Sequence, residues 1–229
     1  MHIHNCPGCL KPDHKSFCRA CLRKLFGGKT ISPILPFSKP EFNSAKLSQG
    51  NRISISGVQT KHSLKLNKKN LELTDQGGEY ILKPIPKGEY DRMEEMPANE
   101  HVTMQIAEQV FGLNTAANAL VFFKDGEPAY LTKRFDRNVD GSKSQQEDFA
   151  QLAGRSEDTD GLHYKYDSSY QEIADLMQTF IAPYAIEVEK FFRLVLFNYL
   201  IHNGDAHLKN FSLIRDPGKG IYVLAPAYD

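Results

Sequence analysis

The chain of 229 residues is long enough for one ordinary domain or for a two-lobed fold with a small appendage. Hydrophobic residues make up 41% and charged residues 24%, as in globular proteins, and the 28 basic and 28 acidic residues balance. This balance argues against a protein dominated by nucleic-acid binding, and no apolar run reaches the roughly 20 residues of a membrane helix. The first residues lack the apolar core of a secretion signal, so we expect a cytoplasmic protein with reduced cysteines.

All four cysteines lie near the amino terminus, in two Cys-x-x-Cys turns. The turns are Cys6-Pro-Gly-Cys9 and Cys18-Arg-Ala-Cys21. Two such turns separated by a short spacer are typical of a tetrahedral zinc site, because each turn chelates the ion from one side. We therefore predict a structural Zn²⁺ knuckle over residues 1–27, with two disulfides or redox chemistry as the alternatives. Three histidines are further candidate ligands: His2, His4 and His14.

A knuckle of this size cannot fold on apolar burial alone. Its folding free energy would come from the metal, so we expect chelation to unfold only the first ~25 residues. Residues 28–51 are rich in Gly, Pro, Ser and Lys, which predicts a linker with one short turn at most.

The segment Ser54-Ile-Ser-Gly-Val-Gln-Thr-Lys61 precedes an alternating strand over Ser63–Leu66. A glycine among small hydroxyl residues can form a turn whose backbone amides face an anion, although a plain hairpin has the same pattern. The next predicted strand, Gly78–Pro84, carries Lys83 directly before a proline. This lysine is either a phosphate-pairing residue or an exposed strand lysine.

Residues Asn99–Phe111 predict a helix, because apolar residues recur on one face and Gly112 can end it. The apolar stripe consists of Val102, Ile106 and Val110. Glu100 in the first turn is favourable for the helix dipole, and we expect it to reach Lys83.

A predicted hairpin follows the helix, with strands over residues 119–123 and 129–135 and a turn over 124–127. Two strands, a helix and a hairpin predict a small lobe with one antiparallel sheet over residues 52–135.

The rest of the chain, residues 136–229, predicts a largely helical region. A capping box at Ser168–Gln171 opens one helix. The apolar residues that we expect this helix to bury are Ile173, Leu176, Met177 and Phe180. A second helix over residues 191–200 is apolar all round, which predicts that it is buried. Short strands over residues 211–214 and 221–224 then lead to Asp229.

The polar loop after the second helix, Ile201–Asn210, contains Asp205 and Asn210. Two such residues on one loop and an aspartate from a later strand are the arrangement that kinases use. The first aspartate takes or orients the proton of the attacking hydroxyl, and the other two residues hold Mg²⁺ on the ATP phosphates. The alternative is a polar loop that only caps a buried helix.

Together these motifs resemble the HipA-type serine/threonine kinases, the toxin components of bacterial toxin–antitoxin systems, from about Ser54 to Asp229. Seven motifs carry the resemblance: the phosphate loop Ser54–Lys61, the lysine strand Ile81–Pro84, the helix start Asn99-Glu-His101, the hinge Lys133–Arg137, the sequence Gln146-Glu-Asp-Phe149, the catalytic motif Asn203–Asn210 and the metal motif Ala225–Asp229. The resemblance implies an α+β, bilobal, protein-kinase-like fold. Its antiparallel N-lobe covers residues 52–135 and its helical C-lobe residues 136–229, after the zinc knuckle.

The resemblance also implies roles for individual residues. Asp205 would be the catalytic base, Asn210 and Asp229 the Mg²⁺ ligands, and Lys83 the partner of the ATP phosphates. Further ATP-binding positions would be Ser56, Gly57, Val58, Gln59, Lys61, Glu100, Lys133, Phe135 and His207. The family's phosphate loop can carry an autophosphorylated serine, which Ser54 matches best and Ser56 second. A phosphate there adds roughly −1.5 to −2 charges where the ATP phosphates must lie, so it should inhibit binding.

The resemblance implies partners as well: a protein substrate such as an aminoacyl-tRNA synthetase, and a DNA-binding antitoxin. The N-terminal subdomain of full-length family members is replaced here by the zinc knuckle, so we expect a separate protein to supply it. Family kinases continue past the final Tyr-Asp with helices that complete the large lobe, so we expect a shortened large lobe in this chain.

Two other functions compete with a protein kinase. A small-molecule phosphotransferase fits the catalytic loop, which also resembles those of sugar, choline and aminoglycoside kinases, but the Ser54–Gln59 loop argues against it. A catalytically inactive binding module fits the shortened lobe. The presence of the complete set Lys83, Asp205, Asn210 and Asp229 argues against that reading.

Overall fold

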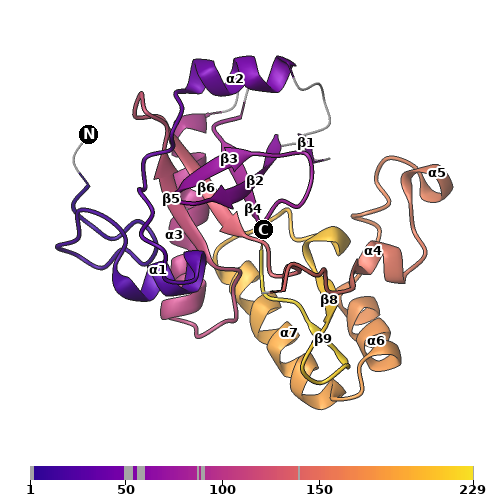
Figure 1. Cartoon of the computed structure of the whole chain (residues 1–229). Helices are drawn as coiled ribbons and strands as arrows, with labels where there is room; N and C mark the ends of the chain where they lie inside the picture. The colour runs from indigo at the N-terminus through magenta and orange to yellow at the C-terminus, as the bar shows by residue number, and fades with distance from the viewer. Residues whose placement is uncertain are drawn as a thin grey trace. The chain divides into compact units, whose positions relative to one another are not determined.

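The computed structural model describes residues 3–48, 54–55, 60–86, 88, 91–138 and 140–228. The chain forms two compact units (Figure 1), which we call unit 1 (Met1–Ile106 and Ala116–Arg134) and unit 2 (Ala107–Thr115 and Phe135–Asp229). Among the described residues, no helix combines the length and the apolar character needed to cross a membrane.

Unit 1 holds one antiparallel sheet and the helices that accompany it. Its elements are α1 (Arg19–Phe26), α2 (Lys39–Ser48), β1 (Ser54–Ile55), β2 (Lys61–Asn67), β3 (Asn70–Leu73), β4 (Tyr80–Pro84), the 3₁₀ turn η2 (Met93–Glu95), most of α3 (Met96–Gln109), β5 (Asn118–Phe122) and β6 (Pro128–Lys133). The strand order is β1-β2-β4-β6-β5, with β3 paired to β2. The predicted antiparallel sheet is therefore confirmed, and β1 and β3 are additional strands.

Strand β4 lies between β2 and β6 and is the most buried of the strands around it. Tyr80 and Leu82 are each at most 2% exposed, and Lys83 lies opposite Tyr130 of β6. Because β4 has neighbours on both sides, two hydrogen-bonded ladders fix its backbone. The strand that carries Lys83 thus lies inside the sheet of unit 1.

The segment expected as a linker contains helix α2. Phe42 in α2 is 1% exposed, and its ring lies 5.3 Å from that of Phe123 and 4.7 Å from that of His62. Upstream, Leu35 donates its backbone N–H to the carbonyl of Phe122. The structure differs from the sequence prediction here because Ile31, Leu35 and Phe42 join the buried core of the sheet.

Helix α3 begins three residues before the predicted start and buries a different face. The predicted stripe is exposed: Val102 is 40% exposed, Ile106 39% and Val110 73%. The buried face contains His101 and Gln105, which both hydrogen-bond to Asn118 Oδ1 of β5, at 2.8 and 3.0 Å. These hydrogen bonds give partners to His101 Nδ1 and to the Gln105 amide nitrogen, so a partly polar face can pack on the sheet.

Unit 2 combines helices with a three-stranded antiparallel sheet in the order β7-β8-β9. Its elements are β7 (Gln146–Asp148), α4 (Phe149–Leu152), α5 (Glu157–Asp160), α6 (Tyr170–Phe180), α7 (Tyr184–Leu200), the 3₁₀ turn η3 (Leu208–Asn210), β8 (Ser212–Arg215) and β9 (Tyr222–Leu224). The two predicted strands after the catalytic loop are confirmed as β8 and β9. Strand β7, which pairs with β8, had no alternating pattern that predicted it.

Two predictions for the unit 2 helices need correction. The cap of α6 is Ser169, which accepts a hydrogen bond from the backbone of Glu172, rather than Ser168. Within α6, Ile173 and Met177 are buried as predicted, but Phe180 is 45% exposed. Helix α7 is not buried all round, since Phe192 is 64% exposed while Phe191 is 3% exposed. Apolar composition alone could not show that only one face of α7 meets the described neighbours.

Replacing Phe42 by alanine tests the role of α2 in the core of unit 1. We expect Phe42→Ala to lower the free energy of unfolding by about 3–5 kcal/mol, because a fully buried aromatic ring leaves a cavity. The half-exposed Val102 is the control, and Val102→Ala should cost about 1 kcal/mol or less. Urea unfolding followed by circular dichroism measures both, and equal losses would contradict a structural role for α2.

Candidate active site and cysteine cluster

Lys83 lies in a nearly closed environment in unit 1. Its side chain is 3% exposed, and its Nζ donates to Glu100 Oε1 of α3 at 2.6 Å. The ammonium also lies 5.5 Å from the centroid of the Tyr130 ring on β6. A buried ammonium needs an anion nearby, and here a helix carboxylate supplies it. The predicted contact between Lys83 and Glu100 is confirmed, and Lys83 is not an exposed strand lysine.

Three further candidate residues of unit 1 lie on the same sheet. Lys61 begins β2 and pairs with Ile55 of β1, and Lys133 ends β6 opposite Tyr80. Ser54 lies in β1, where it pairs with His62 of β2. Four residues of the predicted phosphate loop lie outside the described residues: Ser56, Gly57, Val58 and Gln59.

The predicted catalytic loop in unit 2 follows α7 through a sharp change of backbone direction. His202 has φ +57°, a left-handed conformation that L-residues rarely adopt. The side chain of Asn203 then accepts a hydrogen bond from the backbone N–H of Asp205 at 3.1 Å. Such a turn is a common use of asparagine, because its amide side chain imitates a backbone turn. The loop therefore fixes the backbone of Asp205 while its side chain stays accessible.

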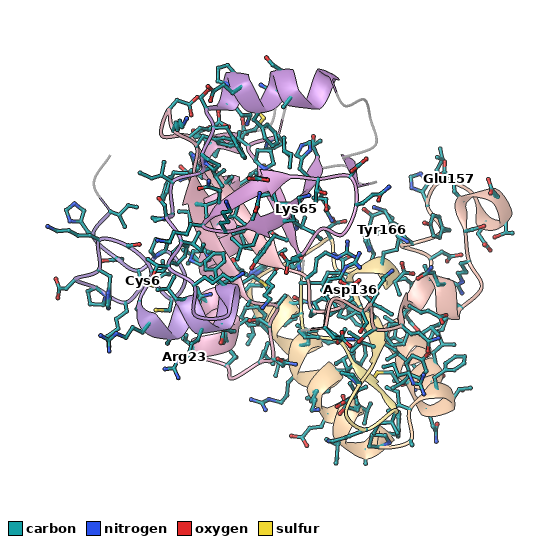
Figure 2. All side chains as sticks on the ribbon, viewed as in Figure 1. Cys6, Arg23, Lys65, Asp136, Glu157 and Tyr166 are labelled. Carbon is teal, nitrogen blue, oxygen red and sulfur yellow. The ribbon has the colours of Figure 1, made fainter. Side chains whose placement is uncertain are left out.

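The carboxylate of Asp205 already accepts a hydrogen bond from a hydroxyl group. Tyr166, in the loop before α6 (labelled in Figure 2), donates its phenolic hydroxyl to Asp205 Oδ1 at 2.7 Å. His207 Nε2 lies 3.9 Å from the same oxygen, and its ring packs edge-on against Tyr166. The Asp205 side chain is 71% exposed. A carboxylate in this position can accept a proton from a second hydroxyl that displaces Tyr166.

Asn210 has an oxygen with the properties of a metal ligand. Its Oδ1 is buried and has no hydrogen-bond donor among the described residues, whereas most buried amide oxygens have one. Oxygen atoms of amides and carboxylates are the protein ligands that Mg²⁺ takes. Asn210 therefore fits a magnesium site, and the second predicted ligand, Asp229, lies outside the described residues.

Neighbouring residues anchor the turn that carries Asn210. Leu208 is 1% exposed in the core of unit 2. Lys209 donates to Asp148 Oδ2 at 2.7 Å, and Asp148 also caps α4. Burial lowers the pKa of Lys209, but the hydrogen bond and the charge of Asp148 outweigh it and raise the pKa. Both neighbours hold η3 in place, so Asn210 is presented by a fixed backbone.

The segment before Asp229 is attached to the same loop. The hydroxyl of Tyr228 donates to the backbone carbonyl of Lys209 at 2.7 Å and lies 2.6 Å from Ser212 Oγ. The ring of Tyr228 lies 5.5 Å from that of Phe135, a predicted ATP-binding residue. The backbone at Tyr228 is thus held beside Lys209, next to Asn210 in sequence.

The four cysteines form one cluster in unit 1 that could hold a metal ion. Their Sγ atoms all lie within 4.8 Å of one another, and none of the four cysteines forms a disulfide. A hydrogen bond with Cys21 lowers the pKa of Cys6 to about 4, and the same contact raises the pKa of Cys21. The cluster thus favours at least one thiolate, the form of cysteine that binds metals.

Three functional candidates escaped the sequence prediction. Tyr166 lies in a polar loop without a recognisable pattern, so only the structure reveals its contact with Asp205. The pair of Lys209 and Asp148 joins residues 61 positions apart. Asp148 belongs to the Gln146–Phe149 motif, and its likeness to a helix cap is the one signal for it in the sequence. Tyr228 lies in the Ala225–Asp229 motif, for which the sequence predicts no role of the tyrosine.

Two relatives match nearly the whole chain. A protein of Haemophilus influenzae named "Putative kinase" is 35% identical over 217 residues, which cover 91% of this chain and 61% of that protein. The Sinorhizobium fredii protein "Putative kinase Y4dM" is 36% identical over 228 residues, which cover 90% of this chain and 52% of that protein. The chain therefore spans only a little more than half the length of these relatives.

Two solved structures share the fold. HipA of Shewanella oneidensis MR-1, solved with HipB and its operator DNA, has a TM-score of 0.57 at 26% identity, covering 86% of this chain and 51% of that chain. The Helicobacter pylori proinflammatory kinase CtkA has a TM-score of 0.54 at 20% identity, covering 76% of this chain and 54% of that chain. At this identity the similarity shows the fold alone. The predicted α+β, HipA-like kinase fold is therefore confirmed.

The sequence pattern of the HipA-like C-terminal domain matches residues 53–229, which is well over half of the chain. This match begins where the first strand of the unit 1 sheet begins and includes Lys83, Glu100, Asp205 and Asn210. The chain therefore belongs to the HipA-like C-terminal domain family.

Proposed function

We propose that the chain is an ATP-dependent serine/threonine protein kinase of the HipA toxin type. The observation that carries the proposal is the ion pair between Lys83 and Glu100, which is 2.6 Å long and in which the lysine side chain is 3% exposed. A strand lysine paired with a helix glutamate must be in place for protein kinases to act on ATP. The names of the relatives support the same chemistry.

In the proposed reaction, unit 2 supplies the base. A serine hydroxyl of the protein substrate replaces Tyr166 as hydrogen-bond donor to Asp205, and its proton moves to the carboxylate. The serine oxygen forms a bond to the γ-phosphorus of ATP, and the bond between that phosphorus and the ADP oxygen breaks. The position of Tyr166 supports this role. Its hydroxyl oxygen lies 2.7 Å from Asp205 Oδ1, within the range of about 2.6–3.2 Å that proton transfer requires.

The charges of ATP need several partners. Lys83 would pair with the phosphates while Glu100 orients it, and Lys61, Lys133, Phe135 and His207 remain proposed ATP-binding residues. Asn210 and Asp229 would hold Mg²⁺, which neutralises the phosphate charge when bound. The proposed phosphate loop comprises Ser56, Gly57, Val58 and Gln59. The cysteine cluster would hold a structural Zn²⁺ that takes no part in the reaction.

The substrate and partners follow from the family rather than from this chain. The related HipA structure contains HipB and operator DNA. We therefore propose a DNA-binding antitoxin as a partner, a translation protein such as an aminoacyl-tRNA synthetase as the substrate, and a separate protein in place of the N-terminal subdomain. Binding of ATP and Mg²⁺ without turnover would instead favour an inactive binding module.

Substitution of the proposed base tests the reaction directly. We expect Asp205→Ala to reduce phosphoryl transfer to a protein substrate by about 10²–10⁴-fold, because the attacking hydroxyl loses its proton acceptor. The circular dichroism spectrum should not change, since the Asp205 side chain is exposed. Asp158→Ala, which removes an exposed carboxylate on α5, is the control with normal activity. A loss smaller than tenfold would place the base elsewhere.

A double-mutant cycle tests the pair in unit 1. Glu100→Leu removes the carboxylate to which the buried Lys83 ammonium donates, so we expect a loss of about 3 kcal/mol in unfolding free energy. The double variant Lys83→Met/Glu100→Leu removes both charges and should recover most of that stability. It should nevertheless fail to bind ATP in calorimetry.

The exposed Lys65 on the neighbouring strand β2 is the matched control for this cycle. Lys65→Met should leave both stability and ATP binding unchanged. If the double variant were as unstable as Glu100→Leu, the pair would not be the source of the loss.

Autophosphorylation is tested by intact-mass spectrometry after incubation with ATP and Mg²⁺. We expect the chain to gain one phosphate, which Ser54→Ala removes if Ser54 is the site and Ser56→Ala removes if Ser56 is the site. The control is Ser44→Ala, in helix α2, which should still gain the phosphate. Unchanged labelling in the variant that lacks both Ser54 and Ser56 would contradict autophosphorylation in this loop.

A further inference from the structure

The cysteine cluster has the dimensions of a metal site. The Sγ atoms of Cys9 and Cys18 lie 3.8 Å apart, and all four sulfurs lie within 4.8 Å of one another. Four thiolates around Zn²⁺ at about 2.3 Å form a tetrahedron whose edges are about 3.8 Å. Four protein ligands leave no open position, so a metal bound here would be structural rather than catalytic.

The backbone around the cluster lies close to the sulfur atoms. Cys18 donates its N–H to Cys6 Sγ at 3.2 Å, as outer groups do around metal thiolates. A Cβ atom on Gly8 would lie 2.8 Å from Cys21 Sγ, so this position has no room for a side chain. Leu10, just after the first pair, has φ +61°, which costs free energy and persists only when the surroundings hold it.

The cluster is continuous with the core of the unit 1 sheet. Cys6 is 0% and Cys21 7% exposed, and both belong to one buried cluster with Leu64, Leu82 and Val121 of the sheet. Figure 2 labels Cys6 within this N-terminal segment. The four cysteines therefore pack in the same core as the strands of the sheet.

Two hydrogen bonds connect the segment to the strands. The carbonyl of Pro7, between the first two cysteines, accepts the backbone N–H of Leu120 on the edge strand β5 at 2.9 Å. The hydroxyl of Tyr80, on the same strand as Lys83, donates to the carbonyl of Leu25 at 2.9 Å in a buried position. Leu25 lies in α1, which also carries Cys21.

We propose that the four cysteines bind one Zn²⁺, and that this ion holds together the sheet that carries Lys83. Loss of the metal releases Pro7 from the edge of β5 and Leu25 from Tyr80, so it loosens β4 and β5 as well as the first residues. The ion acts as a clamp on unit 1, and its removal offers a route by which metal supply controls the lysine strand. The metal site and the clamp stand without the kinase reaction.

Native mass spectrometry and hydrogen exchange of the full chain test the proposal. We expect one zinc ion per chain as purified. Removal of the ion by a thiol-reactive mercurial and chelator should accelerate exchange in β5 (Asn118–Phe122) and β4 (Tyr80–Pro84) by about tenfold or more, because both strands then open locally. Reduction followed by added Zn²⁺ should restore slow exchange. Strand β8 (Ser212–Arg215) of unit 2 is the internal reference and should not change.

Variants separate the two parts of the proposal. Cys9→Ser, at a half-buried ligand, should lose the zinc and show the fast exchange of the stripped chain, whereas the exposed control Ser16→Ala should keep both. If Cys9→Ser does not fold, the stripped and reloaded wild-type chain gives the same comparison. A chain without metal, or one lighter by the thiol hydrogens of two disulfides, would overturn the site. Faster exchange confined to the first ~25 residues would overturn the clamp.

Discussion

A lysine ammonium that is 3% exposed needs an anion nearby, and in unit 1 the Glu100 carboxylate supplies one. This requirement couples strand β4 to helix α3, because the ammonium comes from one and the carboxylate from the other. The helix in turn is held to β5 by His101, whose Nδ1 bonds to Asn118. Burial lowers the pKa of His101, so the imidazole stays neutral and forms this contact without a charge. The position of Lys83 thus depends on three elements.

Unit 2 places its candidate groups in another way. Asp205 and Asn210 come from a polar loop, and polar loops lack a core of their own. Here the loop is fixed by the buried side chain of Leu208 and by the hydrogen bonds of Lys209 with Asp148 and Tyr228. Leu208 and Lys209, which make these contacts, are the two residues before Asn210 in the sequence. The carboxylate of Asp205 can therefore stay exposed to a substrate while the backbone that carries it does not move freely.

The sequence predicted those parts of the fold and site whose signals are local. The two cysteine pairs, the strand with Lys83 and the loop with Asp205 each show their chemistry within ten residues. Contacts between distant segments could not be read in this way. Helix α2 depends on Phe42 meeting Phe123, and Tyr166 meets Asp205 from 39 positions away. The buried face of α3 was predicted wrongly, because the neighbouring sheet decides which face is buried. Val102 of the predicted stripe is 40% exposed.

The cysteine segment shows why a short metal-binding motif need not be a separate domain. A segment of about 25 residues cannot bury enough apolar surface to fold alone, so it needs either a metal or a neighbour. This chain offers both, a cysteine cluster and a neighbour, since Leu25 and Phe26 of α1 are at most 2% exposed in the core of the sheet. The N-terminal segment also covers the edge strand β5, and an uncovered edge would leave backbone groups unpaired. Pro7 and Pro33 accept hydrogen bonds from the backbone of that edge strand, so the N-terminal segment and the sheet stabilise each other.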